Sequence, residues 1–428
     1  MTETFPRRLT IAQLQIEQLR ALLTSLRPGN RFYTAKLEAA GFTKTINNLT
    51  EYFDRFPFTF KQELTEDQQA NPVFGTNLSY PVERYRRCHQ TSGTAGTPLR
   101  WLDTAESWNW MLGTWEYVLR TAGVTFTDRI FFAFSFGPFL GFWLAFEAAT
   151  RLGCLCLPGG NLNSSARLRT ILDLGATVLC CTPTYALRLA EVAAQEKIDL
   201  AASQVRIILM AGEAGGSIPS TRARIEQLWP GARVRDHHGM TEVGPVTFEC
   251  PGRPCVLHVM ESSYIAEVIN PATGRSVGPG ETGELVLTTL GRTGSPLLRY
   301  RTGDLVKPAL DSVCQCGRSD LALEGGILGR TDDMVVIRGV NVYPSAVEEI
   351  IQTCGGVAEY QARVSTHRAL TELTLQIEPA PDCPDPAALA QNLERALATS
   401  LSLRVPVQVA PAGSLPRFEM KARRWIRA

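Results

Sequence analysis

Between residues 129 and 235, short apolar runs alternate with longer stretches of helical periodicity, and this alternation limits the fold more than any other feature of the sequence. The short runs predict buried strands and the longer stretches predict helices. The predicted strands cover residues 129–136, 177–181, 207–210 and 233–235, and the predicted helices cover residues 140–152, 184–194 and 220–229. Strands that alternate with helices form a parallel sheet with helices on its faces, and ligands bind beyond the carboxyl ends of such strands. The expected fold class is therefore α/β.

The part of the chain before this region has a different sequence pattern. Residues 11–26 predict an amphipathic helix, because leucines recur there at helical spacing. These leucines are Leu14, Leu19, Leu22 and Leu23. A loop-rich stretch is expected from the end of this helix to about Arg87.

The part after about Val256 predicts two smaller units. Segments 264–269 and 284–288 are β-like and lie between glycine-rich turns, which predicts a β subdomain. A polar segment near Gly329 separates this subdomain from a small α+β domain. The elements expected in that domain are strands at 334–338 and 340–343, a helix at 345–353, two more strands and a helix at 386–401. We therefore expect a large N-terminal domain, 1–329, and a C-terminal domain, 330–428.

The composition argues against several classes of partner. The chain has 43 basic and 42 acidic residues, and its net charge of +1 gives no long-range attraction to nucleic acid or to an anionic membrane. The most apolar stretch, residues 130–148, contains Gly137, Pro138 and Glu147, so it predicts a buried strand and a core helix rather than a membrane span. No apolar segment of an export signal follows the first residues, and the eleven cysteines are scattered. We expect a cytoplasmic protein with reduced thiols.

Residues 91–98, Thr-Ser-Gly-Thr-Ala-Gly-Thr-Pro, combine hydroxyl side chains with glycines in tandem. Glycine lets backbone N–H groups converge on an anion, and the hydroxyls add donors to phosphate oxygens. No Gly-Lys-Ser/Thr follows, which distinguishes this segment from the Walker-type phosphate loop. The segment predicts phosphate binding, and the alternative is a flexible surface turn.

Two further segments carry carboxylates suited to a nucleotide. Residues 236–242, Asp-His-His-Gly-Met-Thr-Glu, follow the predicted strand 233–235, where a carboxylate can hold Mg²⁺ beside a phosphate. In residues 300–304, Tyr-Arg-Thr-Gly-Asp, the aspartate is suited to accept both hydroxyls of a ribose. The alternatives are a solvated loop with two histidines and a common Gly-Asp turn.

The order of these motifs along the chain is more informative than any one of them. Gly-Arg-Thr-Asp-Asp follows at 329–333, Ile-Arg-Gly-Val-Asn at 337–341, and Leu-Pro-Arg-Phe-Glu-Met-Lys at 415–421. As a set they closely resemble the core motifs of the adenylate-forming superfamily of acyl-CoA synthetases, adenylation domains and luciferases. Within it the chain is similar to the phenylacetate–CoA ligase family over nearly its whole length. The family's marks include Phe-Tyr at 32–33, Phe-Pro-Phe-Thr at 56–59 and Gly-Val-Asn-Val-Tyr-Pro at 339–344.

The resemblance implies an active site between a large N-terminal domain and a small mobile C-terminal domain, with ATP, Mg²⁺ and CoA as cofactors. Lys421 would bridge the carboxylate and α-phosphate oxygens, Thr241 would contact the α-phosphate, and Glu242 would ligate Mg²⁺. Positive groups there offset the repulsion between the two negative reactants. Asp332 or its neighbour would be the hinge. The residues implied to bind the nucleotide are Thr91, Ser92, Gly93, Thr94, Gly96, Thr97, Glu213, Ala214, Asp236, His237, His238, Gly239, Met240, Asp304 and Arg330.

The chain departs from the family pattern at four places, none of which removes an implied role. Ala95 stands where a threonine or serine is usual, and His238 stands where a tyrosine is usual. Ala-Gly-Glu-Ala-Gly at 211–215 replaces Gly-Ala-Glu-Pro. Met420 replaces the glycine before Lys421, a change that could slow or re-pose this lysine.

The acid substrate is expected to bind in a pocket whose walls suit a flat aromatic ring. His237 is a wall residue that could pair with a polar substituent of the acid. The alternative for any single phenylalanine is core packing. The residues expected to line the pocket are Phe134, Phe136, Phe139, Ala211, Gly212 and His237.

Three cysteines and a histidine outside the nucleotide motifs suggest a metal site. Cys250, His258, Cys314 and Cys316 are a standard tetrahedral zinc set, and some relatives in the family have this arrangement. Four protein ligands would make such a zinc structural, because no position stays open. Cys255 is a competing ligand, and the alternative is a group of reduced thiols near a turn.

These observations favour an aryl-CoA ligase that activates a small aromatic acid as acyl-AMP and transfers it to CoA. Residues 338–341 support CoA, because in relatives this loop helps form the pantetheine tunnel. One alternative keeps the adenylation step but passes the acyl group to a carrier protein or to an amine. The other alternative is a non-catalytic nucleotide-binding homologue, which the presence of Glu242, Asp304 and Lys421 disfavours. The sequence sets no oligomeric state, and the resemblance leaves a homodimer open.

Overall fold

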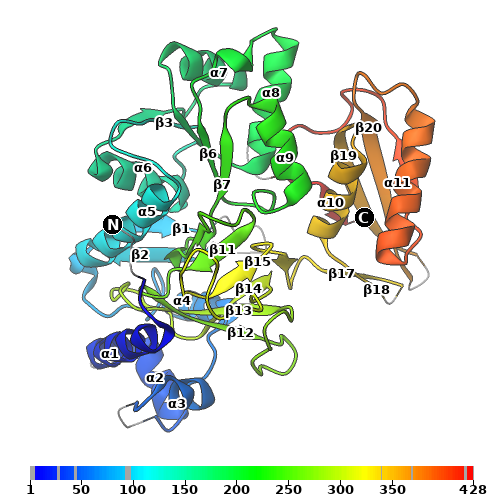
Figure 1. Cartoon of the computed structure of the whole chain (residues 1–428). Coiled ribbons are helices and arrows are strands. Elements are labelled where there is room, and N and C mark those ends of the chain that lie inside the picture. The colour runs from blue at the N-terminus through cyan, green and yellow to red at the C-terminus, as the bar shows by residue number, and fades with distance from the viewer. Residues whose placement is uncertain are drawn as a thin grey trace.

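The alternating region folds into a parallel sheet with the strand order β4-β3-β5-β6-β7 (Figure 1). The computed structural model describes residues 5–26, 29–42, 46–91, 98–338, 340–367, 370–418 and 422–427. The strands are β3 (Arg129–Phe132), β4 (Leu155–Pro158), β5 (Val178–Cys181), β6 (Ile207–Met210) and β7 (Arg233–Asp236). The helices around them are α5 (Ala105–Thr121), α6 (Gly141–Leu152), α7 (Ser164–Asp173), α8 (Pro183–Gln195) and α9 (Pro219–Leu228), with the 3₁₀ turn η2 (Leu200–Ala202) after α8. The predicted α/β fold is confirmed.

Local sequence signals explain where these helices begin and end. The side-chain oxygen of Thr182 accepts a hydrogen bond from the Tyr185 N–H and caps α8, and Pro183 occupies the first turn, where no N–H is needed. Helix α6 ends at Gly153, whose φ of 95° is the left-handed conformation that glycine adopts without strain. The strand predicted at 129–136 stops at Phe132, because the chain turns before Pro138 to enter α6.

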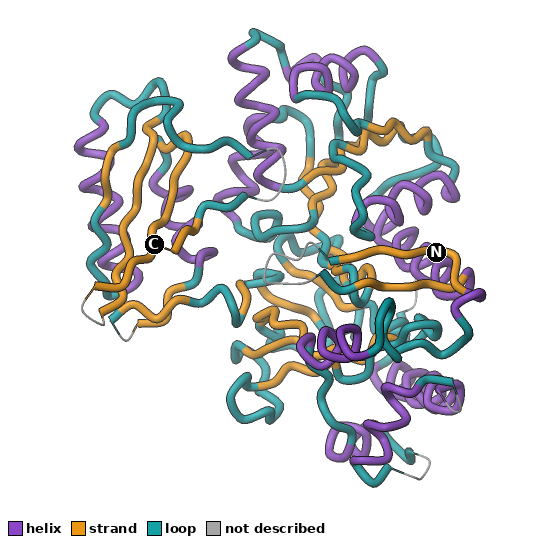
Figure 2. Tube along the Cα trace, turned by 180° about the vertical axis from the view of Figure 1, so that it is seen from behind, coloured by secondary structure: helices purple, strands orange, loops and turns teal. Residues whose placement is uncertain are grey.

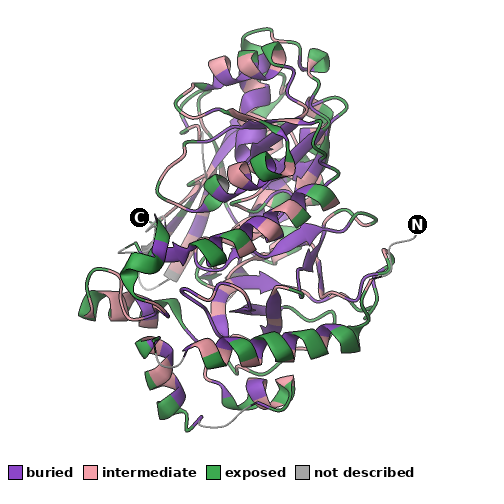
Figure 3. Ribbon diagram, turned by 90° about the vertical axis from the view of Figure 1, so that its left-hand side faces the viewer, coloured by how far each residue is buried: buried purple, intermediate pink, exposed green. Residues whose placement is uncertain are grey.

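Antiparallel strands form the β subdomain beside the parallel sheet, as predicted. One sheet has the order β12-β13-β14-β16, a second has the order β10-β11-β15, and two hairpins pair β1 with β2 and β8 with β9. The strands are β1 (Tyr85–Gln90), β2 (Arg100–Thr104), β8 (Gly239–Met240), β9 (Gly244–Pro245), β10 (Thr247–Glu249), β11 (Val256–Val259), β12 (Tyr264–Ile269), β13 (Gly283–Thr289), β14 (Tyr300–Val306), β15 (Ala322–Glu324) and β16 (Gly329–Arg330). Strands β10 to β14 are largely buried, whereas the outer faces of the helices are exposed (Figure 3).

The N-terminal part differs from the sequence-based prediction in two places. The stretch between the first helix and Arg87 was expected to be rich in loops, but it contains three helices and a 3₁₀ turn. These elements follow α1 (Arg8–Leu26) and are α2 (Arg31–Ala39), α3 (Leu49–Arg55), α4 (Lys61–Ala70) and η1 (Val82–Arg84). In α1, Leu14 was expected on the apolar face, but it is 44% exposed. The buried stripe runs through Ile11, Leu19, Leu22 and Leu26, and position 14 lies off that stripe.

The C-terminal part has a sheet of its own in the order β21-β20-β19-β22 and a hairpin of β17 and β18 (Figure 2). Its elements are β17 (Val335–Ile337), β18 (Val340–Val342), α10 (Pro344–Cys354), β19 (Val357–His367), β20 (Leu370–Pro379), α11 (Pro386–Leu401), β21 (Val407–Val409) and β22 (Trp425–Arg427). One hydrophobic cluster in this part draws its members from Val335 onward, whereas the other clusters lie earlier in the chain. The division of the chain at residue 330 stays a proposal. Among the helices in the described residues, none is both long and apolar enough to cross a membrane.

Candidate functional site

The carboxyl ends of β6 and β7 bring two of the predicted segments together. The His237 N–H donates to the Met210 carbonyl at 3.1 Å, so segment 236–242 starts beside segment 211–215. Gly216 packs so tightly against Asp236 that an added Cβ would lie 2.5 Å from its Cγ, which explains the glycine. Burial disfavours the charged carboxylate and raises the pKa of Asp236 to about 6, although hydrogen bonds from the Ser217 hydroxyl and the His237 N–H oppose this rise.

The predicted magnesium ligand, Glu242, has a side chain only 6% exposed and an ion-pair partner. Its Oε1 lies 3.0 Å from Lys61 Nζ and 3.5 Å from the Tyr300 hydroxyl. Backbone pairing between Thr59 and β14 explains why Lys61 lies beside Glu242, because the Thr59 N–H donates to the Arg299 carbonyl at 2.9 Å. Sequence reasoning did not single out Lys61. The available signal was its position two residues after the Phe-Pro-Phe-Thr motif at 56–59.

Asp304, predicted to bind the ribose, lies at the centre of a charged group. His238 Nε2 is 3.2 Å from its Oδ2, and Arg330 Nη1 donates to its Oδ1 at 2.9 Å. Burial would raise the pKa of Asp304, but these two neighbours outweigh that effect, and the pKa lies below the ordinary value. The same Arg330 donates to both carboxylate oxygens of Asp332, at 2.8 and 3.1 Å. One side chain therefore joins the predicted ribose ligand to the predicted hinge.

Several predicted residues lie outside the described part of the chain. These are Ser92, Gly93, Thr94, Gly96 and Thr97 of the phosphate segment and Lys421, together with Ala95 and Met420. The described residues next to them form hydrogen bonds with other parts of the chain. Thr91 is buried and pairs with Leu99 through its N–H and its hydroxyl, at 2.9 and 3.1 Å. The N–H of Ala422, the residue after Lys421, donates to Glu213 Oε2 at 3.1 Å.

Glu213 therefore bridges the start of α8 and the residue after Lys421. Its Oε1 accepts from the Thr184 N–H at the start of α8 (2.8 Å), while its Oε2 accepts from Ala422. Further contacts between the N-terminal and C-terminal parts lie nearby: Arg424 Nη1 donates to the Thr184 hydroxyl and Arg417 Nε to Glu191, each at 3.4 Å. The predicted nucleotide residues Ala214 and Met240 are exposed and half-buried, respectively.

The residues predicted to line the acid pocket differ in their surroundings. Phe134 is 5% exposed and belongs to the main hydrophobic core, whereas Phe136 and Phe139 are half-buried. Ala211 is half-buried and Gly212 is exposed at the end of β6. On another side of this stretch, Gly137, Pro138 and Trp143 border a cavity of about 320 Å³ that Arg87, Trp108 and Glu147 also line. Contact of these residues with an acid stays a prediction.

His237, which is predicted to line the pocket, has a hydrogen bond that indicates its tautomer. Its Nδ1 lies 2.7 Å from the Thr247 carbonyl, which can only accept, so Nδ1 carries the hydrogen. Burial is the main cause that lowers the pKa of His237 to about 4, so the ring is neutral at pH 7. Its Nε2 is then an acceptor, beside Gly239 and under the Trp115 ring, whose centroid is 4.4 Å from that of the imidazole.

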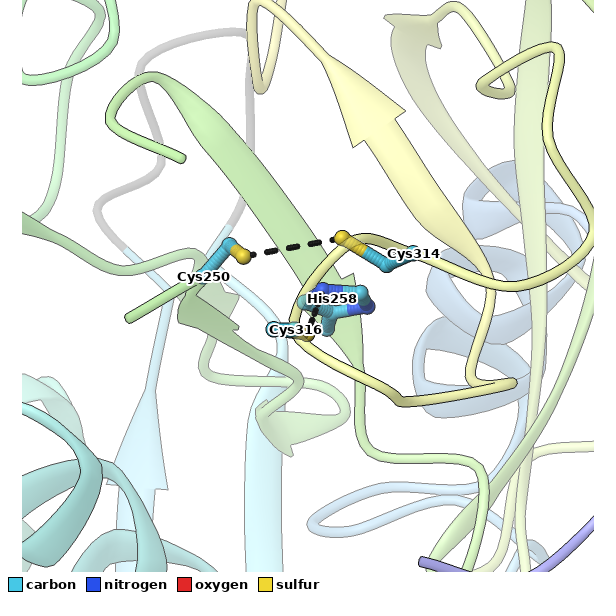
Figure 4. A group of neighbouring side chains, drawn as sticks. All are labelled: Cys250, His258, Cys314 and Cys316. Atoms are coloured by element: carbon cyan, nitrogen blue, oxygen red, sulfur yellow. Dashed lines mark hydrogen bonds between the residues drawn. The ribbon is translucent and has the colours of Figure 1, made fainter. Parts of the chain in front are cut away.

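The four predicted metal ligands converge (Figure 4). Cys250 Sγ lies 3.7 Å from Cys314 Sγ, and Cys316 Sγ lies 3.5 Å from His258 Nε2. A zinc tetrahedron with bonds of about 2.3 Å to sulfur and 2.0 Å to nitrogen separates two sulfurs by about 3.8 Å and a sulfur from a nitrogen by about 3.5 Å. His258 Nδ1 is 3.3 Å from the Asp320 carbonyl, which leaves Nε2 as the free donor atom for a metal. Cys255, the competing ligand, is not a member of the group.

Comparisons with known proteins show the family to which the chain belongs. The family model of the AMP-binding enzyme matches residues 88–291, and that of the AMP-binding enzyme C-terminal domain matches residues 339–427. A phenylacetate-coenzyme A ligase of Thermus thermophilus is 30% identical over 439 residues, which cover 97% of this chain and 96% of that protein. A 2-hydroxyisobutyryl-CoA ligase in the postadenylation state, in complex with R3-HIB-AMP, is 28% identical with a TM-score of 0.93, over 99% of this chain and 91% of that one.

The chain is less similar to a second structure of a 2-hydroxyisobutyryl-CoA ligase. In the thioesterification state, with 2-HIB-AMP and CoA, that structure is 29% identical and covers 100% of this chain and 91% of that one, but its TM-score is 0.70. The structure of this chain as a whole is therefore more similar to the postadenylation structure.

Proposed function

The chain belongs to the phenylacetate–CoA ligase family of adenylate-forming enzymes and is an AMP-forming acid–CoA ligase, and from this premise we propose that its substrate is a small aromatic carboxylic acid. The acid is activated by ATP as an acyl-AMP, and CoA then takes the acyl group as a thioester. The observation that carries the proposal is the set of contacts made by the predicted site residues: Glu242 pairs with Lys61, Asp304 with Arg330, and Glu213 accepts from the residue after Lys421.

We propose the following roles for the predicted site residues. Asp304 binds the ribose hydroxyls, and Arg330 and His238 hold its carboxylate in place. Glu242 holds Mg²⁺, an ion that offsets charge on the phosphates when bound. Lys61 supplies a positive charge 3.0 Å from Glu242 and keeps this carboxylate paired before the ion and nucleotide arrive. The segment from Thr91 to Thr97 and Lys421 contact the phosphates, and Asp332 serves as the hinge.

The four-residue cluster supports a structural zinc. Cys250, His258, Cys314 and Cys316 have the donor types and atom spacings that tetrahedral zinc requires, and they leave no position for a substrate. The cluster ties the loop before β15 to β10 and β11, so its role is to hold the β subdomain together. All eleven cysteines are free of disulfides, which supports the further proposal of a reducing, cytoplasmic compartment.

ATP–pyrophosphate exchange tests the proposed function. The panel contains benzoates, phenylacetates, hydroxy- and aminobenzoates and, because of the similar 2-hydroxyisobutyryl-CoA ligase, 2-hydroxyisobutyrate. We expect exchange with an aromatic acid, loss of exchange in Lys421→Ala, and a CoA thioester when CoA is added. Activation of 2-hydroxyisobutyrate alone would contradict the aromatic substrate. Adenylation without a CoA thioester would instead favour a carrier protein or an amine as acceptor.

His237 leads to a prediction on which acid is preferred. Because its neutral Nε2 is an acceptor, an acid with a ring hydroxyl or amino donor is expected to gain a hydrogen bond, an advantage of about tenfold in kcat/KM. His237→Leu should remove this advantage and leave the rate with the unsubstituted acid nearly unchanged. The measurement is exchange with paired acids that differ only in the donor. An equal loss with both acids would mean that His237 supports the fold and does not read the substituent.

A further inference from the structure

Arg292 and Asp103 form an ion pair that is completely buried, with both side chains 0% exposed. Arg292 Nε and Nη2 donate to the two carboxylate oxygens of Asp103 at 2.7 and 2.6 Å. Such a pair costs desolvation free energy, and this cost is offset only when the remaining donors are also satisfied. The groups that accept hydrogen bonds from the remaining donors therefore indicate which backbone segment the pair holds in place.

Those donors reach the backbone of the predicted catalytic segment. Arg292 Nη1 donates to the carbonyls of Thr241 and Glu242, at 2.7 and 2.8 Å. The next carbonyl, that of Val243, accepts from the buried Tyr264 hydroxyl at 2.9 Å. Three consecutive carbonyls are thus held by two side chains, which we name the carbonyl clamp: Arg292 and Tyr264.

The clamp also connects this segment to the predicted phosphate segment. Asp103 lies on β2, and β2 pairs with β1. These two strands flank residues 91–99, so β2 is the strand on which the chain continues after that segment. Arg292 therefore fixes the backbone that carries Thr241 and Glu242 relative to the hairpin that carries the phosphate segment. A hydrogen bond to a carbonyl fixes the backbone from which the side chain projects, and a shift of about 1 Å in such a group can cost about 100-fold in rate.

We propose that the carbonyl clamp is a positioning device for adenylation, in which Arg292 and Tyr264 set the places of Thr241 and Glu242 relative to the β1–β2 hairpin. This inference rests on the proposed function of those two residues. Arg292 touches no substrate. It acts through the backbone, so its loss should change the use of Mg²⁺ and ATP, and not stability alone.

The chain offers a matched control in Arg299 and Glu267. This pair is also buried, with side chains 7% and 5% exposed, and Arg299 also donates to both oxygens of its carboxylate, at 2.9 and 2.7 Å. Its remaining donors also reach two carbonyls, but these belong to Phe53 and Phe56 at the end of α3. The two arginines differ chiefly in which backbone they hold.

The test compares Arg292→Lys with Arg299→Lys, because lysine keeps the charge but loses the forked geometry. Thermal unfolding and ATP–pyrophosphate exchange are measured on the full chain over ranges of ATP and Mg²⁺. Both variants should unfold at a lower temperature. Arg292→Lys alone should lower the exchange kcat about 100-fold, and it should raise the Mg²⁺ concentration for half-maximal rate about tenfold, as losses behind a metal ligand do.

A variant pair of smaller effect keeps the test decisive if Arg292→Lys does not fold. Tyr264→Phe removes only the hydrogen bond to Val243 and should lower kcat about fivefold. Its control is Tyr52→Phe, which removes the 2.8 Å contact of a buried tyrosine hydroxyl with Thr288 in the N-terminal part. The clamp is refuted if wild-type protein exchanges but each variant matches its control in kcat and Mg²⁺ dependence. Absence of exchange in the wild-type protein would refute the proposed function instead.

Discussion

Replacing Glu242 with glutamine is expected to lower the adenylation rate by about 100- to 1000-fold, because a preorganised charge at the phosphates is lost. Glutamine keeps the shape of the side chain but has no charge to hold Mg²⁺. The buried carboxylate faces Lys61 and the Tyr300 hydroxyl, so the site has few ways to compensate. The measurement is ATP–pyrophosphate exchange during a Mg²⁺ titration, in which the remaining rate should no longer saturate in the range where the wild type does.

A control separates this role from the general cost of changing a buried carboxylate. Glu267→Gln alters a carboxylate that is also buried and paired with a cation, Arg299. It should destabilise the protein without changing the Mg²⁺ dependence of exchange. Lys61→Ala leaves the Glu242 carboxylate in place but removes its partner, so it should retain Mg²⁺ dependence. A Glu242→Gln enzyme with wild-type rate and Mg²⁺ dependence would show that the ion is held elsewhere.

Sequence patterns predicted four strands and three helices of the α/β region because their signals are local, but β4, α5 and α7 were missed. Strands β5 and β6 are continuous apolar runs, and their flanking helices have clear caps such as Thr182 for α8. The N-terminal helices were missed because their sequences are mainly polar; α4 buries only Leu64 among its residues. Their N-cap residues, Asn30 and Asn48, are a signal that the sequence does contain. In the structure the side chains of these residues accept hydrogen bonds from the N–H groups of Tyr33 and Glu51.

The candidate site was predictable where one motif carries the chemistry and unpredictable where two distant segments meet. The segment 236–242 and Asp304 could be named from local sequence, and the zinc set could be named from its ligand types together with the resemblance to relatives that have the same arrangement. Lys61 beside Glu242 depends on the pairing of Thr59 with β14, which is a property of the topology. The bond from Ala422 to Glu213 depends on the arrangement of the C-terminal part. No periodicity in the chain encodes either contact.

The second large effect is expected at the metal cluster. Cys314→Ser should abolish stoichiometric zinc binding and lower the free energy of unfolding by about 4 kcal/mol, because losing a structural metal is among the most destabilising single changes. For a domain of this size such a loss lowers the unfolding temperature by roughly 10 °C. The two measurements are elemental analysis of purified protein for one zinc per chain and thermal unfolding before and after treatment with a chelator.

Cys255→Ser supplies the matched control for the metal cluster, since Cys255 is a half-buried thiol in the turn between β10 and β11 but lies outside the converging group. It should retain zinc and should unfold near the wild-type temperature. The chelator should lower the unfolding temperature of the wild type and of Cys255→Ser, and it should have no further effect on Cys314→Ser, because a metal that is already lost cannot be removed again. Equal unfolding temperatures with and without zinc would instead mean that the four side chains pack as reduced thiols, and the β subdomain would then depend on its hydrophobic contacts alone.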